Sequence, residues 1–326
     1  MNILITGCAG FIGFHLTLKL LNNKKYTLIG IDDLNSYYDI NLKKDRLKIL
    51  KKKNKDFKFY KINISKRSLL NNIFKKYNID IVLHLAAQAG VRYSINNPKI
   101  YMDSNIIGFF NILDLSNNYN IKHLYFASSS SVFGNNLNFP WNENTNSDNP
   151  LSFYAASKKS NEVFAYAYSK IYKLKCTALR FFTVYGEWGR ADMALFKFMD
   201  SIVKNKTISL YNNGENIRDF TNIHDVTNII VKLLNKKNKQ KSNFEVYNIS
   251  SNKPIRVTKL LKLIEKHAGL KSKTRLVGYQ KGDAIKTYSK NAKITRKVNY
   301  KFEKNIDIGV KEFVNWYLKY YNLNIK

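Results

Sequence analysis

The chain has 326 residues, of which 44% are hydrophobic and 14% aromatic, so it can bury a substantial core and is not a disordered protein. No apolar run approaches ~18 residues, which argues against a membrane-spanning helix. Cys8 and Cys176 are the only cysteines, which excludes a disulfide framework and favours a reducing compartment. The opening residues read as a strand and show no secretory leader, so a cytoplasmic protein is expected.

The formal net charge of +32 is the most unusual global property of the chain. Lysines occur along the whole sequence, and their densest run lies between Lys43 and Lys61. We interpret this charge as a compositional bias on solvated surfaces, because no aromatic interleaving or nucleic-acid motif accompanies it. The alternative is a patch for nucleic acid or a membrane, and a weaker version is a field that attracts an anionic substrate. We therefore expect no specific nucleic-acid partner and no membrane association.

The first part of the chain alternates short apolar runs with helical patterns. This alternation predicts an α/β fold with a doubly wound parallel sheet, the Rossmann arrangement, over residues 1–180. The expected strands cover 3–5, 26–32, 57–63, 79–87, 121–132 and 175–182, and the expected helices cover 10–21, 67–77, 104–118 and 153–172.

The alternation of strand and helix patterns is less regular in the remainder of the chain, residues 181–326. We expect a smaller C-terminal substrate lobe there, built against the carboxyl edge of the sheet, with some segments exchanged between the two parts. The expected helices lie near 191–204, 224–236, 257–267 and 308–321, and short strands are expected at 208–212 and 244–250.

Glycines punctuate the junction between the first strand and the first helix, in the stretch "ILITGCAGFIG". Gly7 can adopt a turn conformation that is closed to other residues, Gly10 lets the backbone approach a pyrophosphate, and Gly13 lets the helix pack on the strand. The helix N-terminus then offers free N–H groups and a partial positive charge to the anion. The pattern therefore predicts a dinucleotide site, with an ordinary turn as the alternative.

An acidic pair, Asp32 and Asp33, ends the second strand about 20 residues after these glycines. A carboxylate at that place can accept a hydrogen bond from the 2′-hydroxyl of an adenosine ribose. The same charge repels a 2′-phosphate, so the expected cofactor is NAD rather than NADP. A simple surface acid is the alternative interpretation.

The stretch "YAASK" places Tyr154 and Lys158 four residues apart, which is one face of a helix. A cationic lysine beside a phenol favours the phenolate and lowers its pKa, so Tyr154 can act as a general base on an alcohol. Lys158 can also hold the nicotinamide ribose. The preceding strand ends in four serines, Ser128 to Ser131, whose hydroxyls would reach the crevice where ligands bind in such sheets.

Several motifs in this sequence resemble the extended short-chain dehydrogenase/reductase family. They are the glycine turn, "HLAAQAGVRYS" (84–94), "ASSSSVFG" (127–134) and "YAASK" (154–158). Three further stretches make the chain similar to the UDP-glucuronate 4-epimerases of that family, which serve polysaccharide biosynthesis. These are "RFFTVYGEWGRADMALFKF" (180–198), "RDFTNIHDV" (218–226) and "GDAIKTYS" (282–289), and the resemblance covers essentially the whole chain.

The resemblance implies an NAD-dependent 4-epimerisation of a UDP-uronic acid, UDP-glucuronate to UDP-galacturonate, through a 4-keto intermediate. It also implies a homodimer. Tyr154, helped by Ser129, would take the proton of the 4-hydroxyl. The implied cofactor-binding residues are Gly7, Gly10, Phe11, Ile12, Gly13, Asp32, Asn63, Ile64, Leu85, Ala86, Ala87, Tyr154 and Lys158. The implied substrate-binding residues are Ser129, Ser130, Ser131, Thr183, Arg190, Arg218 and Asp283.

The sequence departs from the family pattern at several of these motifs. Glu187 stands where proline is usual, His224 replaces a common aspartate, and Phe133 replaces a common tyrosine. Asn63 stands where an aspartate commonly meets the adenine. Neither Glu187 nor His224 has an explanation from the sequence alone.

Other functions stay open at this stage. An epimerase for UDP-N-acetylglucosaminuronate or UDP-glucose would keep the fold and the chemistry. Related UDP-glucuronate decarboxylases and sugar-nucleotide dehydratases carry an acid within the segment that corresponds to "SSSSV", where this chain has only hydroxyls. A non-catalytic NAD sensor or RNA-binding protein is the alternative from another class. The five histidines show no metal-ligand spacing, so no metal is expected, and His84 is expected to be a core residue.

Overall fold

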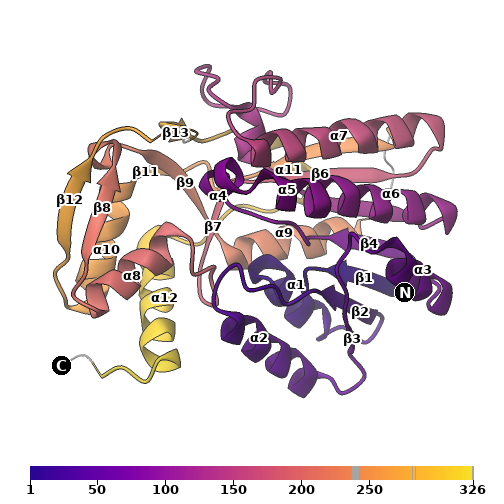
Figure 1. The fold of residues 1–326 in the computed structure, drawn as a ribbon, viewed down its shortest axis with the longest axis horizontal. Helices are drawn as coiled ribbons and strands as arrows, with labels where there is room; N and C mark the ends of the chain where they lie inside the picture. Colours follow the sequence, from indigo (N-terminus) through magenta and orange to yellow (C-terminus); the bar gives the residue numbers. More distant parts are fainter. Residues whose placement is uncertain (237–241, 281, 283, 325–326) are drawn as a thin grey trace.

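A seven-stranded parallel sheet forms the centre of the larger part of the molecule (Figure 1). The computed structural model describes residues 1–236, 242–280, 282 and 284–324. The strand order is β10-β6-β5-β4-β1-β2-β3, and every neighbouring pair is parallel. The strands are β1 (Asn2–Thr6), β2 (Thr27–Asp32), β3 (Lys58–Lys61), β4 (Ile81–His84), β5 (His123–Ser129), β6 (Cys176–Phe181) and β10 (Phe244–Ile249).

Alternate side chains of each central strand enter two separate cores, because successive residues of a strand point to opposite faces. Ile3 and Ile5 of β1 pack into one core, whereas Leu4 between them packs into the other. Helices α1 (Phe11–Leu20), α2 (Ile40–Lys53), α9 (Ile223–Asn235) and α11 (Ala292–Val298) cover the first face. Helices α3 (Arg67–Lys76), α6 (Gly108–Asn118) and α7 (Phe153–Ile171) cover the second. The sheet is therefore buried on both sides, as the apolar runs predict.

A smaller lobe lies beyond the carboxyl ends of the strands, at the left of Figure 1. Its own core joins the helices α8 (Ala194–Val203), α10 (Val257–Ala268) and α12 (Ile306–Tyr320). Its strands are β7 (Thr183–Tyr185), β8 (Thr207–Tyr211), β9 (Ile217–Asn222), β11 (Pro254–Arg256), β12 (Lys273–Val277) and β13 (Lys286–Thr287). Short helices α4 (Val91–Asn96) and α5 (Pro98–Tyr101), followed by a π-helical segment (Met102–Ile107), connect β4 to α6.

The predicted fold class is confirmed, and the strand and helix positions agree with expectation over most of the first part. Helix α2 was not predicted. Strand β10, together with α9 and α11, belongs to the layers of the large sheet although it follows the first strands of the lobe. The division of the chain into residues 1–180 and 181–326 stays a prediction. No helix among the described residues is long and apolar enough to cross a membrane.

A buried ion pair joins β6 to α7 beneath the carboxyl edge of the sheet. Arg180 donates from Nε and Nη2 to the two carboxylate oxygens of Glu162, at 2.9 and 2.8 Å, and Ser128 Oγ donates to the same carboxylate at 2.5 Å. The two charged side chains are only 5% and 6% exposed. Such a pair tolerates the loss of either partner poorly, because the remaining charge stays buried.

We therefore expect Glu162→Gln to lower the free energy of unfolding by about 3–5 kcal/mol, because Arg180 keeps its charge without a counter-charge. Urea denaturation measures this change. The matched control is Lys99→Gln, which removes an ion pair to Asp103 whose side chains are 86% and 46% exposed. That control should shift the free energy of unfolding by less than about 0.5 kcal/mol. Equal effects of the two substitutions would contradict this account of the buried pair.

Candidate functional site

A cavity of about 720 Å³ runs along the carboxyl ends of the strands and continues into the lobe. This is where ligands bind in open parallel sheets. Every predicted cofactor and substrate residue that the structure describes lines it, whereas Asp283 lies outside the described residues. From the cofactor set these are Gly7, Gly10, Phe11, Ile12, Gly13, Asp32, Asn63, Ile64, Leu85, Ala86, Ala87, Tyr154 and Lys158, and from the substrate set Ser129, Ser130, Ser131, Thr183, Arg190 and Arg218.

The glycine turn leaves no room for side chains where it meets its neighbours. Gly7 has φ +73°, and a Cβ on it would lie 2.7 Å from the backbone nitrogen of Ala86. A Cβ on Gly13 would lie 2.0 Å from the carbonyl oxygen of Gly7. Helix α1 starts directly after Gly10, with neither a side-chain cap nor an acidic residue in its first turn. Its first N–H groups are therefore available to an anion in the cavity, as a dinucleotide phosphate requires.

Asp32 lies at the end of β2 and is only 7% exposed. Its carboxylate accepts hydrogen bonds from the backbone N–H groups of Ala9, at 3.1 Å, and Leu34, at 2.9 Å. Burial raises its pKa, while these hydrogen bonds and the nearby Lys43 ammonium oppose that shift. The carboxylate thus braces the glycine turn as well as lining the cavity, and this second role was not expected from the sequence.

Tyr154 and Lys158 lie on one face of α7 and both line the cavity, but their electrostatics differ from expectation. Burial raises the pKa of Tyr154, although a hydrogen bond with Ser129 and the charge of Arg190 lower it in part. Burial lowers the pKa of Lys158 to about 7, and its Nζ donates to the carbonyl oxygen of Ala127 at 2.8 Å. The expected lowering of the Tyr154 pKa by a lysine cation is therefore wrong for the protein alone, because burial disfavours both charges.

The four serines from Ser128 to Ser131 have two different roles. Ser128 turns to Glu162, as described above, and so helps to hold the buried ion pair. Ser129 Oγ accepts from the backbone N–H of Ser131 at 3.1 Å and caps a short 3₁₀ turn, Ser130–Phe133. This cap holds the hydroxyls of Ser129, Ser130 and Ser131 at the cavity wall.

Arg190 enters the cavity from the segment that follows β7. It makes a two-point ion pair with Asp192, in which Nε donates to Oδ1 at 2.9 Å, and Tyr37 donates to the same carboxylate at 3.1 Å. The sequence analysis missed Asp192 and Tyr37. Asp192 stands two residues after Arg190, within the stretch 180–198 that resembles the UDP-glucuronate 4-epimerases. The charge of Arg190 is thus partly compensated before any substrate binds.

Two further arginines line the cavity near the lobe. The guanidinium of Arg92 lies over the ring of Tyr211, 4.1 Å from its centroid, so it connects α4 to β8 across the cavity. Its place in the cavity wall is compatible with substrate contact. Arg218 donates from Nη1 to the carbonyl oxygens of Ile217 and Ile285, at 2.9 and 3.1 Å.

His84 is a core residue, as predicted. It is 2% exposed, and its Nδ1 pairs with Thr6 Oγ1 at 2.8 Å. His224 lies instead in a group with Glu187 and Glu312, whose side-chain donor atoms are all within 4.8 Å of one another. These charges are already paired, because His224 binds Glu187 and Lys304 binds Glu312, so we assign no metal to the group.

Comparison with known proteins places this arrangement in a family. The family model described as GDP-mannose 4,6 dehydratase matches residues 4–313. The chain belongs to this epimerase/dehydratase family of extended short-chain dehydrogenases/reductases. Within the family, the chain is 46% identical to the protein CapI of Staphylococcus aureus, over 98% of this chain and 99% of that protein.

Two other family members are informative. The UDP-glucuronate 4-epimerase of Thermodesulfobacterium geofontis is 39% identical, over 96% of this chain and 95% of its own length. The UDP-glucuronic acid 4-epimerase of Bacillus cereus, solved in complex with UDP-glucuronic acid and NAD, superimposes with a TM-score of 0.92. It is 28% identical, and the alignment covers 98% of this chain and all of that chain. The family resemblance inferred from the motifs is therefore confirmed.

The buried amine of Lys158 generates a stability prediction. Its pKa in the folded protein is about 7, compared with 10.5 when exposed, so the charged amine costs free energy in the fold. That cost is fully present below about pH 7 and declines as the pH rises toward the unfolded value. We therefore expect Lys158→Met to raise the Tm of the cofactor-free protein, most at low pH, while weakening NAD binding.

Thermal unfolding at several pH values and calorimetric titration with NAD measure these two effects. Lys170→Met, on the exposed side of the same helix, is the matched control and should leave both nearly unchanged. A fall in Tm for Lys158→Met at neutral pH would mean that the buried amine stabilises the fold instead.

Proposed function

We propose that the protein is an NAD-dependent UDP-glucuronate 4-epimerase, which interconverts UDP-glucuronate and UDP-galacturonate through a 4-keto intermediate. The observation that carries this proposal is the single cavity in which the glycine turn, the Tyr154–Lys158–Ser129 group and the serine run meet. The relatives named above support the choice of substrate. Two of them carry this support: the protein of Thermodesulfobacterium geofontis is a UDP-glucuronate 4-epimerase, and the epimerase of Bacillus cereus was solved with UDP-glucuronic acid. Each matches this chain over nearly its full length.

The residues present fit an NAD molecule. The backbone of the glycine turn and the start of α1 would hold its pyrophosphate, and Asp32 would accept from a ribose hydroxyl. Lys158 would hold the nicotinamide ribose, with Leu85, Ala86 and Ala87 lining the cofactor beside it. When bound, NAD supplies a reversible hydride acceptor for carbon 4 of the sugar.

Tyr154 is the group that we assign to proton transfer. Its phenolate oxygen can take the proton of the sugar 4-hydroxyl, and the phenol so formed can return that proton after the ring has presented its other face. Ser129 supports this role because its hydrogen bond and the Arg190 charge both favour the phenolate form of Tyr154. Positive charge brought into the cavity with the cofactor would lower the pKa of Tyr154 further, which burial alone does not allow.

The sugar carboxylate needs protection during the reaction. Oxidation at carbon 4 of a glucuronate gives a β-keto acid, which loses carbon dioxide readily. Neutral hydroxyl donors can hold the carboxylate in an unproductive orientation, and each hydrogen bond to a charged group contributes about 1.5–3 kcal/mol. We assign Ser129, Ser130, Ser131 and Thr183 to this task, and Arg190 to the sugar ring or carboxylate nearby.

The test is incubation of the purified protein with UDP-glucuronate, followed by mass spectrometry and chromatography of the nucleotide sugars. We expect UDP-galacturonate with little UDP-pentose. Thr183→Ala should slow the reaction and raise the decarboxylated fraction. Tyr154→Phe should keep NAD binding but lower turnover by about 10²–10⁴-fold, because only the phenolic oxygen is lost.

Parallel incubations with UDP-glucose and UDP-N-acetylglucosamine separate this function from the other epimerases. Mainly UDP-pentose from the unaltered protein would make it a decarboxylase and overturn the assignment of the serine run. Near-normal turnover by Tyr154→Phe would show that another residue is the base.

We also propose that the protein is a homodimer that forms through the exposed face of α7 and of the helical segment that ends in α6. Large apolar side chains are exposed there, namely Ile107 and Phe110 on one side and Val163 and Tyr166 on the other. The two segments pack side by side, so these residues can form one continuous apolar surface. Such a surface is typical of protein interfaces.

Sedimentation velocity tests the dimer. Phe110→Lys should yield a monomer, because it places a charge within the apolar face. Leu276→Lys, which changes an exposed apolar residue of the lobe strand β12, is the matched control and should leave the dimer intact. A monomeric wild-type protein would refute the proposed interface.

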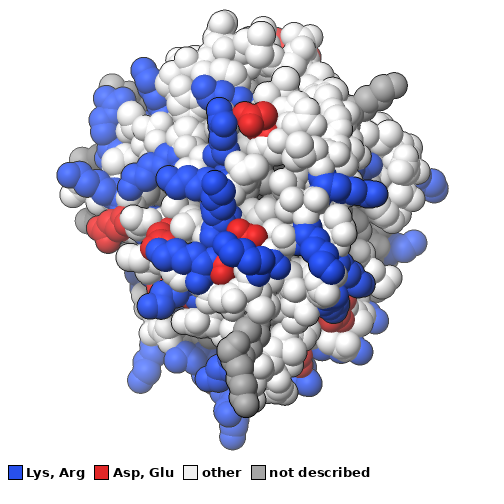
Figure 2. Space-filling model, turned by 90° about the vertical axis from the view of Figure 1, so that its left-hand side faces the viewer, with Lys and Arg blue, Asp and Glu red and all other residues white. Residues whose placement is uncertain are grey.

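We propose a cytoplasmic protein with no specific nucleic-acid partner. Lys and Arg side chains are spread over the face that the lobe presents, with Asp and Glu scattered among them (Figure 2). A dispersed charge of this kind can raise the encounter rate with an anionic nucleotide sugar without forming a binding groove for a polymer.

A further inference from the structure

The segment that carries Arg190 into the cavity is held from behind by several polar contacts. Arg46 of α2 donates to the carbonyl oxygens of Trp188, at 2.7 Å, and Gly189, at 3.0 Å. His15 of α1 pairs through Nε2 with the carbonyl oxygen of Glu187 at 2.9 Å. Trp188 has φ +55°, a strained value for this residue type, which persists only when its surroundings impose it.

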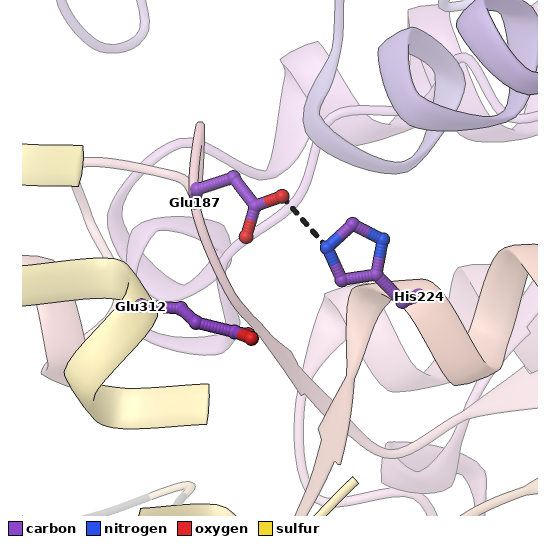
Figure 3. Close-up of side chains that lie close together, drawn as sticks. All are labelled: Glu187, His224 and Glu312. Carbon is purple, nitrogen blue, oxygen red and sulfur yellow. Dashed lines mark ion pairs between the residues drawn. The ribbon is translucent and has the colours of Figure 1, made fainter. Parts of the chain in front are cut away.

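The one side-chain ion pair in this set joins the segment to the start of α9. His224 Nε2 lies 2.7 Å from the Glu187 carboxylate, and Figure 3 shows the two side chains directed toward each other. Asn222 fixes the start of α9, since its side chain accepts from the backbone N–H of His224 at 2.9 Å. Glu187 lies only three residues before Arg190, so a displacement of its side chain is transmitted along a short length of backbone.

We propose that the Glu187–His224 pair positions Arg190 in the cavity. This inference rests on the proposed function for its kinetic test. It also accounts for the two departures from the family pattern that the sequence left unexplained, because the residues at these two positions are each other's partners. Neither lines the cavity, so both act as positioning residues rather than through contact with a ligand.

The charges around His224 favour its protonated form. Glu187 faces it from the Arg190 segment and Glu312 from α12, while Lys304, which precedes α12, opposes them. His15 stacks edge-on against it from α1, with the ring centroids 5.8 Å apart, and stays neutral because burial lowers its pKa to about 4. The hydrogen bond to Glu187 raises the pKa of His224 above 6.5, despite partial burial.

The strength of the Glu187–His224 interaction therefore depends on pH. The full ion pair exists below about pH 6.5. As the pH rises through the raised pKa of His224, it becomes a hydrogen bond between a neutral imidazole and the Glu187 carboxylate, which stays charged because its own pKa is lowered to about 2. The stabilisation of the Arg190 segment should follow the same course. The ratio of wild-type to variant activity isolates this effect, since titration of Tyr154 affects both proteins alike.

The kinetic experiment uses Glu187→Gln, His224→Gln and the double variant in the full-length protein with bound NAD. We expect each single variant to lower kcat/KM for UDP-glucuronate about three- to tenfold at low pH, and the double variant to lose no more than either single one. The difference from wild type should shrink as the pH rises. His267→Gln is the matched control, since it removes a similar pair to Asp307, 2.9 Å long, outside the cavity.

Histidine-ring NMR supplies a readout that needs no turnover. The titration of the His224 ring should move to lower pH in Glu187→Gln and stay unchanged in His267→Gln. Calorimetry with the UDP-sugar should show the same order of affinities as the kinetics. If no UDP-glucuronate is turned over, the proposed function fails. The titration still tests whether Glu187 and His224 interact, and the calorimetry still tests whether their interaction affects binding of the UDP-sugar.

Two results would overturn the inference. One is a wild-type kcat/KM and pH profile in His224→Gln, which would make the pair irrelevant to Arg190. The other is an equal loss in His267→Gln, which would reduce the effect to general stability. Restoration of kcat/KM in the Glu187→Asp variant above the level of Glu187→Gln would support the need for a charge at that place.

Discussion

The close approach of Gly13 to the carbonyl of Gly7 is the constraint on which the rest of the site depends. A side chain at Gly13 would overlap that oxygen, so only glycine lets α1 begin directly at the end of β1. The same turn carries the N–H of Ala9, which the Asp32 carboxylate binds, and the carbonyl of Ala9, to which Arg46 donates. Arg46 also holds the segment that leads to Arg190. One backbone turn thus connects the cofactor end of the cavity with the substrate end.

Burial of charge is the second organising feature. Lys158, Arg190 and Asp32 all lose most of their contact with water, and each does so in the wall of the cavity. The cost is tolerated because each has a partner within the protein: a carbonyl for Lys158, Asp192 for Arg190 and two N–H groups for Asp32. A site built this way is preorganised for charged ligands, and the free energy that it takes from folding returns when they bind.

The sequence predicted the parts of the site that depend on local spacing. The Tyr154–Lys158 pair follows from the period of a helix, and the glycine turn from the end of a strand. Helix α2 was missed because its lysine-rich surface hides a narrow apolar face of Leu42, Leu47 and Leu50, although Asp39 provides a recognisable cap. The pKa values of Tyr154 and Lys158 could not be predicted, since they depend on burial by elements far away in the chain.

The Glu187–His224 pair shows why single departures from a family pattern are hard to interpret. Each residue alone has the wrong chemistry for its position, an acid in place of a proline and a base in place of an acid. Folding brings them within 2.7 Å of each other, so the two changes compensate in charge. A proline restricts the backbone through its ring, whereas a side-chain ion pair restrains it from outside. The two solutions differ in that the second responds to pH, because a histidine can lose its charge where a proline ring has none to lose.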